Sequence, residues 1–221
     1  MYPRSLAKTE VFGISLMDIG TGSILITSGI TYALVESNLC VKLVDPIKGT
    51  FNKVWYTIKH SGAVFLIGIV RPILVKFVNY QEHVSEYGIY WNFFLTIGVV
   101  VILASLVPDS WHIYACFLSL FTMLFYEALI HFTGLQAYIL SDKERFTIID
   151  KNKEGIFQCF GYLSCYFIGL SLGQLYKKCI LRKGDPHYRL FWWQLIFCTS
   201  SLAVFFLSEN FIERSSRRLV R

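Results

Sequence analysis

The sequence has little charge, few prolines and no closely spaced cysteine pair. Only 16% of the 221 residues are Asp, Glu, Lys or Arg, whereas soluble domains typically carry about a quarter. The six cysteines include no Cys-x-x-Cys pair and the five histidines are scattered, so their spacing indicates neither a zinc site nor a disulfide framework. These deficits exclude one large soluble core, and we expect reduced cysteines and no metal.

Hydrophobic residues dominate instead, at 54% of the chain. They come in runs of about 17 to 25 residues, long enough to cross a bilayer as helices. We therefore expect an all-α, multi-pass transmembrane bundle in which residues 1–221 form one membrane-embedded domain. The formal net charge of +6 is spread over the connections, which favours anionic lipid headgroups over nucleic acid as partners. About six spans are expected: residues 11–35, 61–78, 91–107, 111–132, 155–176 and 190–207.

Polar residues set several details of this prediction. Residues 36–59 carry four lysines and are expected to form a solvated loop. The second span is expected to be broken at Arg71-Pro72, because a proline inside a helix frees a backbone carbonyl and kinks the helix. Glu127 and His131 stand four residues apart near the end of the fourth span, and we expect them at the membrane interface.

The most unusual stretch is residues 80–94, which crowd acids, a histidine and aromatic residues between two apolar runs. If the stretch is helical, Glu82, Glu86 and Tyr90 fall on one face, and His83 can share the Glu86 carboxylate. One interpretation is the polar floor of a cavity. The other is an interfacial loop with an aromatic belt.

Asp18 is the one charged residue of the first span. A carboxylate in a span costs about 2.5–3.5 kcal/mol by insertion scales and usually marks function. Helical spacing places Gly22 and Gly29 on roughly the same face, and glycines allow another helix to approach closely. Asp18 is therefore predicted to face the protein interior, either in a site or as a structural hydrogen-bonding group.

Further polar residues flank the apolar runs. Arg71 and Lys76 stand just before the acidic stretch, where they either snorkel to the surface or reach a headgroup phosphate. Asn152 has the position and type of a helix N-cap, and Glu154 would be favourable in the first turn of the fifth span. Asn92 is the one polar exception at the start of an otherwise apolar third span.

Residues 80–94 resemble the signature of the inositol acyltransferases of GPI-anchor assembly, which include the phosphatidylinositol-glycan biosynthesis class W proteins and the fungal GPI-anchored wall transfer proteins. The matching residues are Tyr-Gln-Glu-His-Val-Ser-Glu-Tyr-Gly followed by Trp-Asn-Phe-Phe. Tyr90 stands where the family usually carries His. Looser matches lie around Lys8, from Met17 to Gly22, from Arg71 to Lys76, from Asn152 to Ile156, and from Ser215 to Arg218.

The resemblance implies transfer of a fatty acyl group, usually palmitoyl, from acyl-CoA to the inositol ring of glucosaminyl-phosphatidylinositol in the endoplasmic reticulum membrane. Acyl-CoA is a co-substrate and no other cofactor is expected. The predicted catalytic residues are Lys8, Asp18 and His83. The predicted substrate-binding residues are Arg71, Lys76, Glu82, Glu86, Asn92, Asn152 and Glu154. The resemblance also implies relatives about twice as long, of which this chain matches a central block, so we expect it to be a fragment of a longer protein. The family's proposed aspartate partner of Lys8 would precede Met1.

Two other classes of function fit the same residues. A transporter would use Asp18, Glu82, His83 and Glu86 as a proton or cation path, although transporters commonly show internal repeats and none is visible. A non-catalytic scaffold is the third interpretation. Sequence chemistry alone does not separate them, and the resemblance favours the acyltransferase.

Overall fold

The computed structural model describes residues 19–39, 46–78, 87–141, 144–181 and 199, and every structural statement below concerns these residues. They form helices and connecting turns, and no strand occurs among them. The expected all-α class is therefore confirmed. In chain order the elements are α1 (Ile19–Leu39), α2 (Pro46–Phe77), α3 (Phe93–Ser105), the 3₁₀ helix η3 (Asp109–Tyr114), α4 (Ala115–Phe132), α5 (Leu135–Leu140), α6 (Ile148–Lys151) and α7 (Lys153–Leu181).

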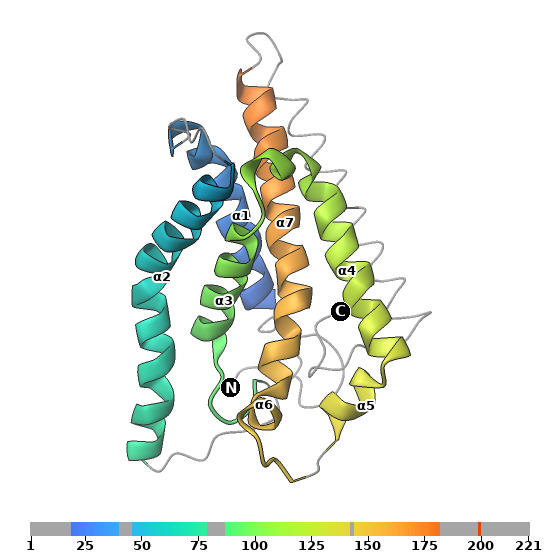
Figure 1. The fold of residues 1–221 in the computed structure, drawn as a ribbon. Helices are drawn as coiled ribbons and strands as arrows, with labels where there is room; N and C mark the ends of the chain where they lie inside the picture. Colours follow the sequence, from blue (N-terminus) through green and yellow to red (C-terminus); the bar gives the residue numbers. More distant parts are fainter. Residues whose placement is uncertain (1–18, 40–45, 79–86, 142–143, 182–198, 200–221) are drawn as a thin grey trace.

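Helix α7 is the central element of the bundle (Figure 1). It packs against α1, α3 and α4, while α2 packs against α3 at the edge. The α7 side chains Cys159, Tyr166, Phe167 and Leu170 are buried in the main hydrophobic cluster. An apolar helix surrounded by other helices needs no separate polar face, which explains why the apolar residues of α7 are not confined to one side of the helix.

Small residues allow α1 and α7 to pack closely. A Cβ atom placed on Gly169 would lie 2.1 Å from the carbonyl oxygen of Ile26, and one on Gly29 would lie 2.3 Å from that of Tyr166. Gly22 and Gly29 were both predicted from sequence to let another helix approach, and this is confirmed for Gly29. It is wrong for Gly22, where a Cβ would meet nothing within 4 Å. Close backbone approach through glycine is a common mode of helix association in membranes.

We expect Gly169→Ala to destabilise the protein by about 1–3 kcal/mol, because the methyl group forces the two backbones apart. The measurement is thermal unfolding in detergent micelles. Gly62→Ala is the matched control, since a Cβ at Gly62 meets nothing within 4 Å and alanine favours the helix by up to about 1 kcal/mol. Equal unfolding temperatures for the two variants would contradict tight α1–α7 packing.

Three described helical segments are long and apolar enough to cross a membrane: Thr50–Phe77, Asp109–Phe132 and Lys153–Lys178. Gly20–Val35 and Phe93–Ser105 are shorter apolar helices. Large apolar side chains such as Phe77 and Phe121 are exposed on α2 and α4, as expected of surfaces in contact with lipid. Apart from residue 199, the expected span at 190–207 lies outside the described residues.

Two predictions about α2 are wrong. Residues 46–59 were expected in a solvated loop, but α2 begins at Pro46 and includes them. Proline suits the start of a helix, because the N–H group that it lacks would have no acceptor within the helix there. Apolar residues such as Trp55 also lie between the lysines of this segment. The expected break at Arg71-Pro72 does not occur either, since α2 continues to Phe77.

Candidate functional site

The end of α2 and the starts of α3 and α7 lie at the same end of the bundle, together with α5 and α6 (Figure 1). The start of α1 also reaches this region, because the hydroxyl groups of Thr21 and Tyr87 are hydrogen-bonded at 3.2 Å. Tyr87, which follows the acidic stretch directly in sequence, therefore lies at this end of the bundle.

The loop of residues 87–92 is docked on the junction of α6 and α7 through its backbone. The Ile89 N–H donates to the Lys151 carbonyl at 2.7 Å, and the Gly155 N–H donates to the Tyr87 carbonyl at 3.1 Å. Gly88 has φ of 101°, and a Cβ there would lie 2.4 Å from the Lys151 carbonyl oxygen. The helical reading of residues 80–94 is thus wrong for 87–92, because Gly88 takes a left-handed conformation that most residues avoid.

Asn152 fixes the same loop with its side chain. Its Oδ1 accepts the N–H groups of Tyr90 and Trp91, each at 2.9 Å. Its Nδ2 donates to the Ile148 carbonyl at 2.9 Å, and the residue is 4% exposed. Asn152 directly precedes α7, as predicted, but its side chain holds a distant loop and does not cap the helix.

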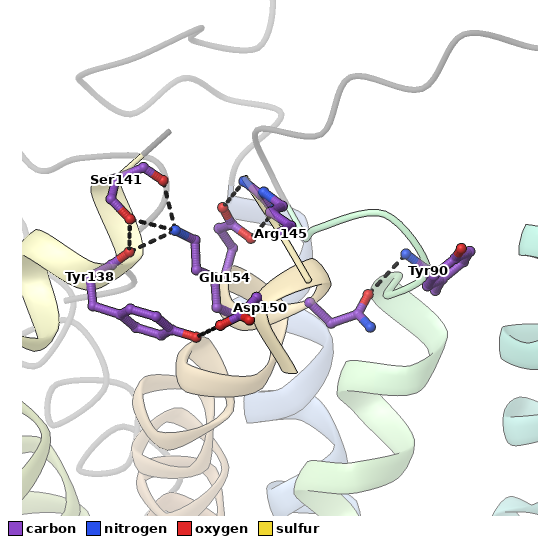
Figure 2. Close-up of polar contacts among 8 residues, drawn as sticks. Tyr90, Tyr138, Ser141, Arg145, Asp150 and Glu154 are labelled. Carbon is purple, nitrogen blue, oxygen red and sulfur yellow. Dashed lines mark hydrogen bonds and ion pairs between the residues drawn. The ribbon is translucent and has the colours of Figure 1, made fainter. Parts of the chain in front are cut away.

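Glu154 forms a buried ion pair with Arg145. The two guanidinium N–H groups reach the two carboxylate oxygens at 2.9 and 2.6 Å (Figure 2). The Glu154 side chain is fully buried and that of Arg145 is 14% exposed. This two-point geometry is the strong form of a charged hydrogen bond. Arg145 carried no predicted role, since nothing in a nine-residue separation across a loop indicates pairing.

Lys153 is also buried, and it ties α7 to the end of α5. Its Nζ donates to the carbonyls of Tyr138 and Ser141, both at 2.7 Å, and to the Ser141 hydroxyl at 2.9 Å. These carbonyls belong to a helix C-terminus, where the last C=O groups lack partners and a cation is favourable. Lys153 therefore stabilises the α6–α7 junction, the corner of the chain that carries Asn152 and Glu154.

Asp150 strengthens the same corner from the solvent side. Thr147 and Asp150 form a reciprocal capping box at the start of α6, and the Tyr138 hydroxyl donates to the Asp150 carboxylate (Figure 2). The hydrogen bond from the Thr147 side chain is the main reason that the pKa of Asp150 falls to about 2. The bond to Asp150 raises the pKa of Tyr138 to about 12.

Asn92 links the loop to α3 and to α2. Its Oδ1 accepts from Phe94 N–H and Leu95 N–H at 3.0 and 3.1 Å, which caps α3. Its Nδ2 donates to the Gly68 carbonyl at 2.6 Å. Gly68 is four residues before Pro72, so this is the carbonyl that proline leaves without its helical partner. The freed carbonyl predicted from sequence is thus satisfied by Asn92.

Arg71 and Lys76 lie on different faces of α2. Five helical residues separate two side chains by about 140° around the axis. Lys76 reaches the loop, where its Nζ donates to the Tyr90 hydroxyl at 3.2 Å and lies 4.4 Å from the centre of the Tyr90 ring. Arg71 is exposed. The structure therefore brings Lys76 to the loop, but not Arg71.

Five predicted site residues lie outside the described residues: Lys8, Asp18, Glu82, His83 and Glu86. Asp18 is bonded to Ile19, the first residue of α1, and Glu86 is bonded to Tyr87 in the docked loop. The roles predicted for all five stay predictions.

A second polar cluster lies at the opposite end of the bundle. Lys53 Nζ donates to Asp109 Oδ1 at 2.5 Å and to the Val107 carbonyl at 3.0 Å, and it lies 3.3 Å from His112 Nε2. A cavity of about 30 Å³ adjoins Lys53, His112 and Tyr32. This cluster was not predicted from sequence, because Lys53 was expected to lie in a loop. The pair expected at the membrane interface is Glu127 and His131. His131 Nε2 lies 3.5 Å from Glu127 Oε2, and the His131 side chain is exposed.

The chain is similar to one family of proteins along its whole length. A family model described as GWT1 matches residues 1–221. The chain is 33% identical to the phosphatidylinositol-glycan biosynthesis class W protein of Dictyostelium discoideum, over 99% of this chain and 50% of that protein. It is 34% identical to GPI-anchored wall transfer protein 1 of Schizosaccharomyces pombe, over 99% of this chain and 46% of that protein. With the protein of the same name from Yarrowia lipolytica, identity is 34% over 84% of this chain and 37% of the relative.

The chain thus spans at most about half the length of these curated relatives. The match to the family model nevertheless covers every residue of the chain, including the docked loop and the α6–α7 junction. The chain therefore belongs to the GWT1 family.

Proposed function

We propose that this chain works as a membrane O-acyltransferase of GPI-anchor biosynthesis. It would move a fatty acyl group, with palmitoyl expected, from acyl-CoA to the inositol ring of glucosaminyl-phosphatidylinositol. The names of the relatives and the membrane-length helices support this proposal. The same pathway makes the endoplasmic reticulum membrane the proposed location.

The observation that carries the proposal is the docking of loop 87–92 at one end of the bundle. This loop continues directly from the stretch that holds Glu82, His83 and Glu86, and the buried Asn152 fixes its backbone. A rigid anchor beside a group of titratable residues is what positioned acid–base chemistry requires.

The proposed reaction needs a base and an electrophilic group. A base removes the proton of an inositol hydroxyl, and the resulting oxygen attacks the thioester carbonyl. The new C–O bond gives a tetrahedral oxyanion. When this intermediate collapses, the C–S bond breaks, and the CoA thiolate leaves and takes up the proton held by the base. We assign the base role to His83 or Asp18, and we assign stabilisation of the oxyanion to Lys8.

The test uses microsomes from cells whose own inositol acyltransferase gene is deleted and which express this protein in its full natural length. Labelled palmitoyl-CoA and glucosaminyl-phosphatidylinositol are supplied, and label in the glycolipid is measured. We expect transfer by the unchanged protein, and loss of transfer in Lys8→Ala with normal expression and membrane insertion. Lys59→Ala, an exposed lysine of α2, is the control. An inactive unchanged protein would contradict the proposed reaction, and an active Lys8→Ala would contradict the role of Lys8.

A further inference from the structure

Lys76 and Tyr90 form a cation–phenol contact at the edge of loop 87–92. They come from different elements, the last turn of α2 and loop 87–92. The Lys76 ammonium group donates a hydrogen bond to the Tyr90 hydroxyl at 3.2 Å. It also lies 4.4 Å from the centre of the Tyr90 ring. We infer that these two side chains form a binding site for a substrate phosphate, and we assign it to the phosphate of the inositol glycolipid. This inference rests on the proposed function.

The pair retains several donors and a positive charge. A lysine ammonium group has three N–H donors and a tyrosine hydroxyl has one O–H donor. Lys76 uses one N–H on the Tyr90 oxygen, which leaves two N–H groups and the Tyr90 O–H. No carboxylate among the described residues forms an ion pair with Lys76. The donors and the net charge therefore match a singly charged phosphodiester.

The backbone around the pair is fixed on both sides. Asn152 accepts the Tyr90 N–H from the α6–α7 junction. Asn92 bonds the carbonyl of Gly68 on α2, two turns before Lys76. Since Asn92 follows Tyr90 by two residues, the loop and the last turns of α2 are held in one frame. A preformed site of this kind loses less conformational entropy on binding than two freely moving side chains would lose.

The surroundings suit a lipid headgroup. Phe77 and Val78 follow Lys76 and are 89% and 75% exposed, so a cation stands at the end of an apolar membrane helix. This is the depth at which a glycolipid carries its phosphate, between acyl chains and sugar. The hydrogen bond from Lys76 also lowers the pKa of Tyr90, which makes the phenol a better donor to a phosphate oxygen.

Acyl-CoA also carries phosphates, so the test separates the two sources. Initial rates of acyl transfer give KM for the glycolipid and KM for palmitoyl-CoA in Tyr90→Phe, Lys76→Met and the double variant. We expect each single change to raise the glycolipid KM roughly tenfold, since a hydrogen bond to a charged group is lost, and to leave the palmitoyl-CoA KM unchanged. The double variant should lose less than the product of the two. Tyr114→Phe and Lys59→Met, both at exposed positions away from the loop, should change neither KM.

A binding arm makes the site testable without catalysis. The protein in nanodiscs is titrated with glycerophosphoinositol, which carries the phosphate, and separately with myo-inositol, which does not. We expect Tyr90→Phe and Lys76→Met to weaken binding of glycerophosphoinositol roughly tenfold and to leave myo-inositol binding unchanged. Unchanged glycerophosphoinositol binding would overturn the phosphate site even if the unchanged protein lacks acyl transfer. A KM effect confined to palmitoyl-CoA would overturn its assignment to the glycolipid.

Discussion

Glu154→Gln is expected to lower the free energy of unfolding by about 3–5 kcal/mol, because removing one partner of a buried ion pair leaves the other charge uncompensated. The Arg145 guanidinium, 14% exposed, would remain beside a neutral amide. The measurement is thermal unfolding in detergent or nanodiscs, together with the amount of folded protein recovered.

Glu144→Gln is the matched control for this change, since it neutralises an exposed acid ten residues away. It should alter stability by no more than about 0.5 kcal/mol, as surface changes usually do. The double change Glu154→Gln with Arg145→Met removes the stranded charge and should recover part of the stability. A Glu154→Gln protein as stable as the control would show that the pair does not hold the corner together.

Asn152→Ala should combine a moderate loss of stability with a large loss of activity. It removes two bonds accepted from loop 87–92 and one donated to Ile148, at about 1 kcal/mol each, so we expect about 2–3 kcal/mol. The acidic stretch with its predicted catalytic His83 precedes this loop directly in sequence, and misplacement of a catalytic group by about 1 Å can cost a hundredfold in rate. We therefore expect kcat to fall at least about tenfold at a temperature where the variant is folded.

Asn152→Asp separates docking from general stability. Aspartate keeps an oxygen that can accept the Tyr90 and Trp91 N–H groups but loses the N–H that binds the Ile148 carbonyl. Its kcat should therefore exceed that of Asn152→Ala. Asn52→Ala, at an exposed position of α2, is the control. Equal kcat for Asn152→Ala and the unchanged protein would rule out a positioning role for this loop anchor.

Helix type and membrane character were predictable because long apolar runs have few alternatives. The helices α3, α4 and α7 cover the central parts of three predicted spans. The start of α2 was not predictable in the same way, since its lysines resemble a loop. Lys53 is stable in that helix only because Asp109 and the Val107 carbonyl, more than fifty residues later, satisfy it.

The partners of the polar residues at the candidate site were even harder to predict from sequence. Asn92, Asn152 and Glu154 were selected for their polarity near apolar runs, and the structure buries all three. Their polar atoms bond to Gly68, to the loop N–H groups and to Arg145. A sequence indicates that such a polar residue needs a partner, but not whether the partner is a substrate or the fold. Their predicted roles in substrate binding stay predictions, whereas their structural roles follow from these contacts.

The most direct test of this account is a cryo-electron microscopy map of the protein in its full natural length with bound glucosaminyl-phosphatidylinositol. We expect headgroup density at the end of the bundle formed by loop 87–92 and the start of α7, with the phosphate beside Lys76 and Tyr90. Headgroup density at the opposite end, beside Lys53 and His112, would contradict it.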